Sequence, residues 1–238
     1  ANSTSSQYFI EQPVQTIMSI LEGTKNVLEF AKKSEVIKVV YLSSLEVYGI
    51  PDQFEVTESD SGYIDWTKPR SSYSEGKRMA ECLCFSYFSQ YNIPVVVSRL
   101  AQTFGQNIQD ADNRVYAQFV RAVKNSKDIV LHTSGKTIRN YCYLSDAVSA
   151  LLYLLVFGEP GEAYNVANEE TAVSIFEMAK IAESLSNGKT KVVFNIDNSI
   201  ERGYNQDVKI KLMSKKLMAL GWKPEIDLNE SYYRMING

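Results

Sequence analysis

Tyr73 and Lys77 have side chains that together could remove a proton from a hydroxyl group. They are four residues apart, so on a helix they lie on one face about one turn apart. An isolated tyrosine has a pKa of about 10, and a positive charge held nearby favours the phenolate, which is a usable base at neutral pH. In a chain with 15 tyrosines, a Tyr-x3-Lys pair is expected about once by chance. The spacing alone therefore leaves open an ordinary surface pair.

The sequence around the pair strengthens the case for a site. The segment 36–42 is apolar and β-branched, as in a strand that is buried on both faces, and it ends in Ser43 and Ser44. Open parallel sheets hold their ligands outside the carboxyl ends of the strands. Tyr73 and Lys77 follow a turn at 69–72 and begin a helix. The serine end of the strand and the start of this helix are therefore the predicted active site.

The elements that position these residues alternate between strands and helices, which predicts an α/β fold with a parallel sheet. The expected helices cover 13–33, 71–91, 115–124, 145–157, 173–185, 213–220 and 228–235. The expected strands cover 36–42, 93–98, 129–133, 163–167 and 192–195. Irregular segments at 106–113 and 199–206 are where substrate choice is expected to lie.

The composition is that of an ordinary globular chain with a formal net charge of −3 and no run of basic residues. This balance argues against nucleic acid or an anionic membrane as a partner. No apolar run is long enough to span a bilayer and no leader pattern opens the chain, so we expect a cytoplasmic protein. Cys82, Cys84 and Cys142 have no histidine neighbours, so we expect buried thiols and no metal site.

The glycines lack the pattern of a dinucleotide-binding loop. Of the 12 glycines only Gly158 and Gly161 stand three apart, and they end a helix. The fingerprint needs several glycines between a strand and a helix.

Several phrases together resemble the extended short-chain dehydrogenase/reductases, and most of all the NAD-dependent nucleotide-sugar epimerases, dehydratases and decarboxylases. They are the Ser44, Tyr73 and Lys77 set and the phrases at 23–29, 43–49, 99–105, 139–146 and 220–224. The resemblance implies a Rossmann-like parallel sheet with a smaller α/β substrate domain. It places the first part at 1–105 and a mainly substrate-binding part at 106–238, with 136–158 packing back on the first.

The resemblance also implies roles for the residues of the site. Tyr73 would take a proton from a sugar hydroxyl while hydride passes to NAD. Lys77 would lower the pKa of Tyr73 and hold the nicotinamide ribose, with Ser43 as a further cofactor contact. Ser44 would hydrogen-bond the reacting hydroxyl. Arg139 would meet the diphosphate of a nucleotide-diphosphate sugar, since its planar fork suits that group, although a surface strand arginine is the alternative.

This chain departs from the family pattern at three places. The 4,6-dehydratases have an Asp-Glu pair after the serine or threonine, whereas Leu45 and Glu46 stand here, so Glu46 is either a base or a hydrogen-bonding group. Gln102 stands where the family often has asparagine, so a substrate contact is altered. Ile20 stands at the position of a structural asparagine.

Family members begin with about 70 to 80 residues that carry the first strands and the glycine fingerprint, and this chain starts after them. We therefore expect a fragment of a longer protein or a self-associating chain, with NAD bound by the intact protein. A homodimer through the helices at 13–33 and 71–91 is predicted. The expected function is 4-epimerase-like hydride transfer on a nucleotide sugar; the alternative is a non-catalytic remnant that binds sugar nucleotides or a partner. A ketone or steroid-type reductase is a third reading, against which the Arg139 phrase argues.

Overall fold

A parallel sheet is at the centre of the first part of the molecule. The structure, a computed structural model, describes residues 6–110, 112–196 and 207–238. The strands β1 (Val39–Ser44), β3 (Val95–Leu100) and β8 (Ala163–Val166) lie in the order β1-β3-β8 and are all parallel. Ser44 is opposite Leu100 in this register, so β1 and β3 end level with each other. This sheet confirms the predicted α/β fold.

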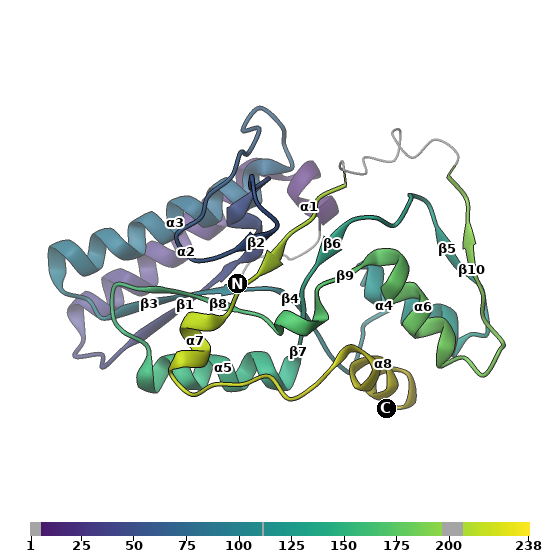
Figure 1. Cartoon of the computed structure of the whole chain (residues 1–238). Coiled ribbons are helices and arrows are strands. Elements are labelled where there is room, and N and C mark those ends of the chain that lie inside the picture. Colours follow the sequence, from purple (N-terminus) through teal and green to yellow (C-terminus); the bar gives the residue numbers. More distant parts are fainter. Residues whose placement is uncertain (1–5, 111, 197–206) are drawn as a thin grey trace.

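Helices cover both faces of this sheet. Helices α2 (Pro13–Lys33) and α3 (Ser71–Tyr91) lie on one face, and α5 (Leu144–Phe157) and α7 (Lys215–Ala219) lie on the other (Figure 1). Val95 and Val97 pack under α2 and α3, whereas Val96 packs into the core that contains Trp222. Successive strand residues point to opposite faces, so a run of valines is what a strand covered on both sides requires.

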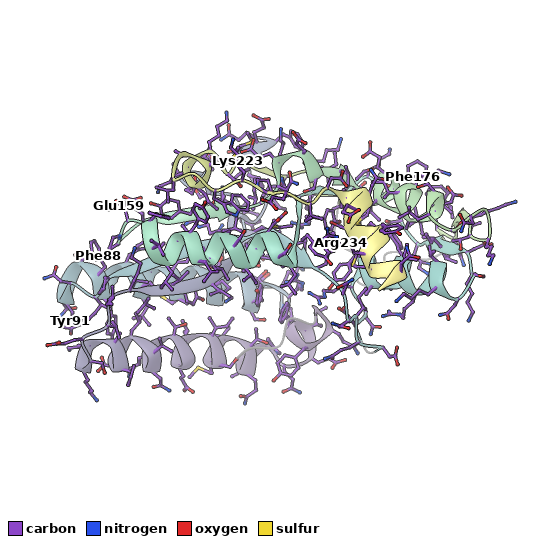
Figure 2. All side chains as sticks on the ribbon, turned by 90° about the horizontal axis from the view of Figure 1, so that it is seen from below. Phe88, Tyr91, Glu159, Phe176, Lys223 and Arg234 are labelled. Carbon is purple, nitrogen blue, oxygen red and sulfur yellow. The ribbon has the colours of Figure 1, made fainter. Side chains whose placement is uncertain are left out.

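The second part of the molecule has its own core, in which Phe104 and Tyr232 are buried. It contains the helices α4 (Val115–Lys124), α6 (Ile175–Ser184) and α8 (Leu228–Asn237), and the strands β4 (Gln102–Phe104), β5 (Ile129–Leu131), β6 (Ile138–Arg139), β7 (Tyr141–Tyr143), β9 (Val173–Ser174) and β10 (Val192–Phe194). Figure 2 shows how far the two parts extend, since Tyr91 marks one end of the molecule and Phe176 lies toward the other.

The two cores do not divide the chain by a single cut at residue 105. Strand β8, helix α7 and Trp222 belong to the first core, although they follow residue 105 in sequence. Residues of α5 such as Ala147 and Leu154 also pack there. The division into two domains stays a prediction.

Short elements complete the fold. They are α1 (Ser6–Glu11), the 3-10 helices η1 (Leu45–Tyr48) and η2 (Glu169–Thr171), and the paired strands β2 (Glu55–Val56) and β11 (Lys211–Leu212). Neither α1 nor β4 was expected from the sequence. Strand β1 begins at Val39 instead of residue 36, because its partner β3 begins only after Pro94, whose carbonyl accepts the Val39 N–H at 2.9 Å.

The cysteines differ in part from the expectation. Cys84 and Cys142 are buried, but Cys82 is exposed, because it lies on the outer side of α3. In the described parts of the chain, no helix is both long and apolar enough to cross a membrane. A cytoplasmic location stays a prediction. The segment 199–206, where we expected part of the substrate choice, is outside the described residues.

Candidate active site

The serine end of β1 turns at once into η1. Ser44 caps this short helix, and its hydroxyl oxygen accepts the Glu46 N–H at 3.3 Å. Gly49 ends η1 with a φ of 62°, and its N–H donates to the Glu46 carbonyl at 3.2 Å. A Cβ at Gly49 would come within 2.4 Å of the Tyr63 carbonyl oxygen. Both the conformation and the close contact require glycine here, and they hold the 43–49 segment in place.

Tyr73 and Lys77 lie in the first turns of α3, next to this serine. The Ser44 hydroxyl lies close enough to the phenol of Tyr73 to lower its pKa. The Lys77 ammonium is 5.8 Å from the centroid of the Tyr73 ring, and it donates to the Leu42 carbonyl at 2.7 Å. The structure therefore brings Ser44, Tyr73 and Lys77 together at the carboxyl end of β1.

The charges around Tyr73 act differently from what the spacing suggested. Burial raises the pKa of Tyr73, and the charge of Glu46 adds to this, while the nearby Ser44 hydroxyl and the Arg70 charge oppose it. The net pKa lies above its usual value. Burial also lowers the pKa of Lys77 to about 8. Desolvation of the Tyr73 phenol thus outweighs the effect of nearby positive charge on its pKa. The pKa is raised, whereas the sequence predicted that it would be lowered.

Glu46 is held by two groups that the sequence did not single out. Arg70 Nη2 donates to its Oε1 at 3.0 Å, and the Ser74 hydroxyl lies 3.4 Å from its Oε2. Burial alone would raise the pKa of Glu46, but the charges of Arg70 and Arg139 lower it below the usual value. A carboxylate whose pKa is lowered and whose two oxygens already accept hydrogen bonds is a weak base. These contacts favour the hydrogen-bonding role over the role of a base.

Arg139 approaches the site from the second part of the molecule, and Gln102 lies in the strand β4 of that part. Arg139 ends β6 and is half-buried, and its charge is close enough to Glu46 to lower that pKa. Within the described ranges, no carboxylate forms an ion pair with Arg139. Gln102 begins β4, directly beyond the end of β3, and is half-buried. Their substrate roles stay predictions.

Ser43 points away from Ser44, into a buried polar network. Its hydroxyl donates to Glu81 at 2.5 Å, and Glu81 receives a forked pair of bonds from Arg99, with the Nη2 at 2.7 Å. Arg99 Nη1 also donates to the Tyr48 hydroxyl at 3.0 Å. The Ser43 hydroxyl proton is thus used within the protein, and the predicted cofactor contact of Ser43 stays a prediction. The network ties β1, η1, α3 and β3 together beneath the site.

A cavity of about 260 Å³ opens beside Lys77, between α2, α3 and the edge strand β1. Gly23, Leu42 and Lys77 are among the residues that line it. Gly76 lets α2 approach closely, since a Cβ there would be 3.0 Å from the Ile20 side chain. The close contact explains how an apolar Ile20 is accommodated at this position.

Some residues of the site carried a sequence signal that could have been used, and others did not. Glu81 is four residues after Lys77 and eight after Tyr73, so it shares their helix face. Arg99 belongs to the phrase at 99–105, which carries part of the resemblance to the family. Phe9, whose ring stacks on Tyr73, is far away in sequence and gave no signal.

The fold agrees with the comparisons to known proteins. The profile of the NAD dependent epimerase/dehydratase family matches residues 1–167. The chain belongs to this family.

Its relatives include enzymes of two kinds. The chain is 30% identical over 217 residues to the dTDP-D-glucose 4,6-dehydratase of Mus musculus, which covers 90% of the chain and 59% of that protein. It is 31% identical over 228 residues to the UDP-glucuronic acid decarboxylase 6 of Arabidopsis thaliana, covering 94% of the chain and 63% of the relative. The chain thus spans about 60% of the length of these relatives.

Solved structures show the same fold. An epimerase from Methanothermobacter thermautotrophicus superposes on all of the chain and on 69% of its own, with a TM-score of 0.87 and 23% identity. The UDP-glucose 4-epimerase of Thermotoga maritima, solved with UDP-glucose, also gives a TM-score of 0.87, with 20% identity and 74% of its chain covered.

Proposed function

We propose that this chain is the catalytic and substrate-binding part of an NAD-dependent enzyme that transfers hydride on a nucleotide-diphosphate sugar, in the manner of a 4-epimerase. The observation that carries the proposal is the meeting of Ser44, Tyr73 and Lys77 at the carboxyl end of β1. Family membership and relatives that act on nucleotide sugars support it.

The residues present fit the nicotinamide end of NAD. Lys77 uses one ammonium donor on the Leu42 carbonyl, which leaves donors for ribose hydroxyls in the cavity beside it. At Gly23 an added Cβ would meet nothing within 4 Å, so the cavity is open on that side. NAD, when bound, accepts and returns the hydride.

The chain's own groups would handle the proton. Ser44 would orient the sugar hydroxyl, and Tyr73, whose phenol lies near the Ser44 hydroxyl, would take its proton. Lys77 would offset the phenolate charge. Glu46, fixed as an anion by Arg70, would accept a hydrogen bond from the sugar.

Dehydration by an adjacent acid and base is disfavoured. Leu45, which stands where the dehydratases have the acid of the pair, is 2% exposed and packs into the core. Epimerisation needs no such pair, because the hydride is returned to the same carbon. We therefore propose epimerisation ahead of dehydration.

The function is tested by incubating the full-length protein with NAD and either UDP-glucose or dTDP-glucose and separating the products by chromatography. We expect a C4 epimer to accumulate. Binding of the sugar nucleotide without conversion would instead support the non-catalytic alternative. If the protein neither binds nor converts the sugar nucleotide, both proposals are contradicted.

Arg139→Ala is expected to weaken the binding of UDP by about tenfold or more, since a charge-assisted hydrogen bond contributes about 1.5–3 kcal/mol. Isothermal titration with UDP measures this. Lys136→Ala is the matched control, because Lys136 is an exposed cation three residues earlier. Unchanged UDP affinity in Arg139→Ala would remove the diphosphate role.

We also propose a homodimer through α2 and α3, which expose Val27, Phe30 and Met79 by 53%, 67% and 56%. Phe30→Glu would place a charge in that interface and is expected to shift the protein from dimer to monomer in sedimentation velocity. Leu152→Glu, at an exposed site on α5, is the control. A wild-type monomer, or a dimer broken only by Leu152→Glu, would contradict this interface.

A further inference from the structure

The short helix α1 places an aromatic ring against Tyr73. The rings of Phe9 and Tyr73 are stacked, with centroids 4.3 Å apart and planes 11° from parallel. Phe9 is 3% exposed, whereas its helix neighbours Tyr8 and Ile10 are 37% and 48% exposed. A six-residue helix on the outside of the molecule thus buries a single large side chain, and it does so on the proposed base.

Two contacts fasten α1 to the start of α3, beside which it lies (Figure 1). The Ser72 hydroxyl, one residue before Tyr73, donates to the Phe9 carbonyl at 3.1 Å. The Arg70 guanidinium is 5.1 Å from the centroid of the Phe9 ring while it pairs with Glu46. The residues directly before Tyr73 therefore fix the position of Phe9.

We propose that Phe9 is a positioning residue that holds the plane of the Tyr73 ring and keeps water from one of its faces. Phe9 acts through Tyr73 and touches no reacting atom itself. Offset stacking of two aromatic rings is favourable beyond the area that they bury, so the contact restrains ring rotation as well as covering it. A catalytic effect of Phe9 rests on the proposed function. The stacking of Phe9 on the Tyr73 ring does not depend on that function.

Phe9 adds apolar cover to a phenol that also has polar and charged neighbours. Ser44, Glu46, Arg70 and Lys77 surround the phenol with polar or charged atoms. Burial is nevertheless the largest influence on its pKa, and it acts upward. An apolar ring stacked on the phenol disfavours the charged phenolate. Removal of that ring would admit water, and the pKa of Tyr73 would fall toward its usual value.

The proposal can be tested with 3,5-difluorotyrosine placed at position 73 and observed by ¹⁹F NMR in the protein without added nucleotide. Fluorination lowers the pKa of the phenol, so that ionisation is followed while the protein is folded. We expect two fluorine signals from a ring that is held. Phe9→Ala should merge the signals and lower the pH midpoint of Tyr73 by about one unit.

Two further variants make the test decisive. Phe9→Leu keeps an apolar cover without the stacked ring, so it should retain most of the midpoint and still allow the ring to turn. Ile10→Ala, an exposed site on the same helix, should change neither signal nor midpoint. If Phe9→Ala and Phe9→Leu both leave the signals and the midpoint as in the wild type, Phe9 does not position Tyr73.

The same variants separate this inference from the proposed function. If Tyr73 is the base, the acid limb of the pH–rate profile of the full-length protein should move to lower pH in Phe9→Ala, following the NMR midpoint. If Tyr73→Phe keeps its turnover, the proposed function fails, while the fluorine signals still decide whether Phe9 holds the ring.

Discussion

Tyr73→Phe is expected to lower the turnover of the nucleotide sugar by about 10²–10⁴-fold, the usual contribution of a positioned acid or base. The substitution removes only the hydroxyl, so the ring that stacks on Phe9 remains. The cap of η1 also remains, because Ser44 accepts the Glu46 N–H and not a bond from Tyr73. Binding of NAD and UDP should therefore be nearly unchanged.

The measurement compares steady-state turnover and UDP affinity in the full-length protein. Tyr91→Phe is the matched control, since Tyr91 is on the same helix at the end far from the site and is 39% exposed. Turnover that equals the wild type in Tyr73→Phe would exclude Tyr73 as the base. A parallel loss of UDP affinity would point to a structural effect.

Arg99→Met is expected to lower the free energy of unfolding by about 3–5 kcal/mol, because it leaves the buried carboxylate of Glu81 without its partner. Arg99 and Glu81 side chains are only 13% and 6% exposed, and their ion pair is 2.7 Å long. The pair also holds Ser43, so its loss would loosen the end of β1 next to Ser44.

Urea unfolding at constant m-value measures this loss. Lys211→Met is the matched control, because the Lys211–Glu55 pair has a 53% exposed carboxylate and should contribute only about 0–1 kcal/mol. The double variant Glu81→Leu, Arg99→Met removes both charges, and it should regain much of the stability. If the double variant is as unstable as Arg99→Met, the stability came from the other bonds of Arg99, to Tyr48 and the Glu58 carbonyl.

Local periodicity accounts for what the sequence predicted well. The parallel sheet, the helices around it and the pairing of Tyr73 with Lys77 depend on residues close in the chain, and the structure confirms the fold. The elements that were missed are short. Helix α1 and strand β4 have six and three residues, too few for a period to show.

Electrostatic behaviour could not be predicted in the same way. The spacing of Tyr73 and Lys77 suggested a lowered pKa at the phenol, but burial raises it. Burial depends on which segments pack over a side chain, and here the packing residue is 64 positions away. The low pKa of Glu46 likewise results from Arg70 and Arg139, which the chain brings from different elements.

The sequence by itself determined which residue types meet at the end of β1, because a buried strand followed by a helix leaves few places for Ser44, Tyr73 and Lys77. Only the tertiary structure decided which serine faces Tyr73 and which joins Glu81 and Arg99. Only it decided that Phe9 covers the phenol, because contacts between distant segments are set by packing and leave no mark in local spacing.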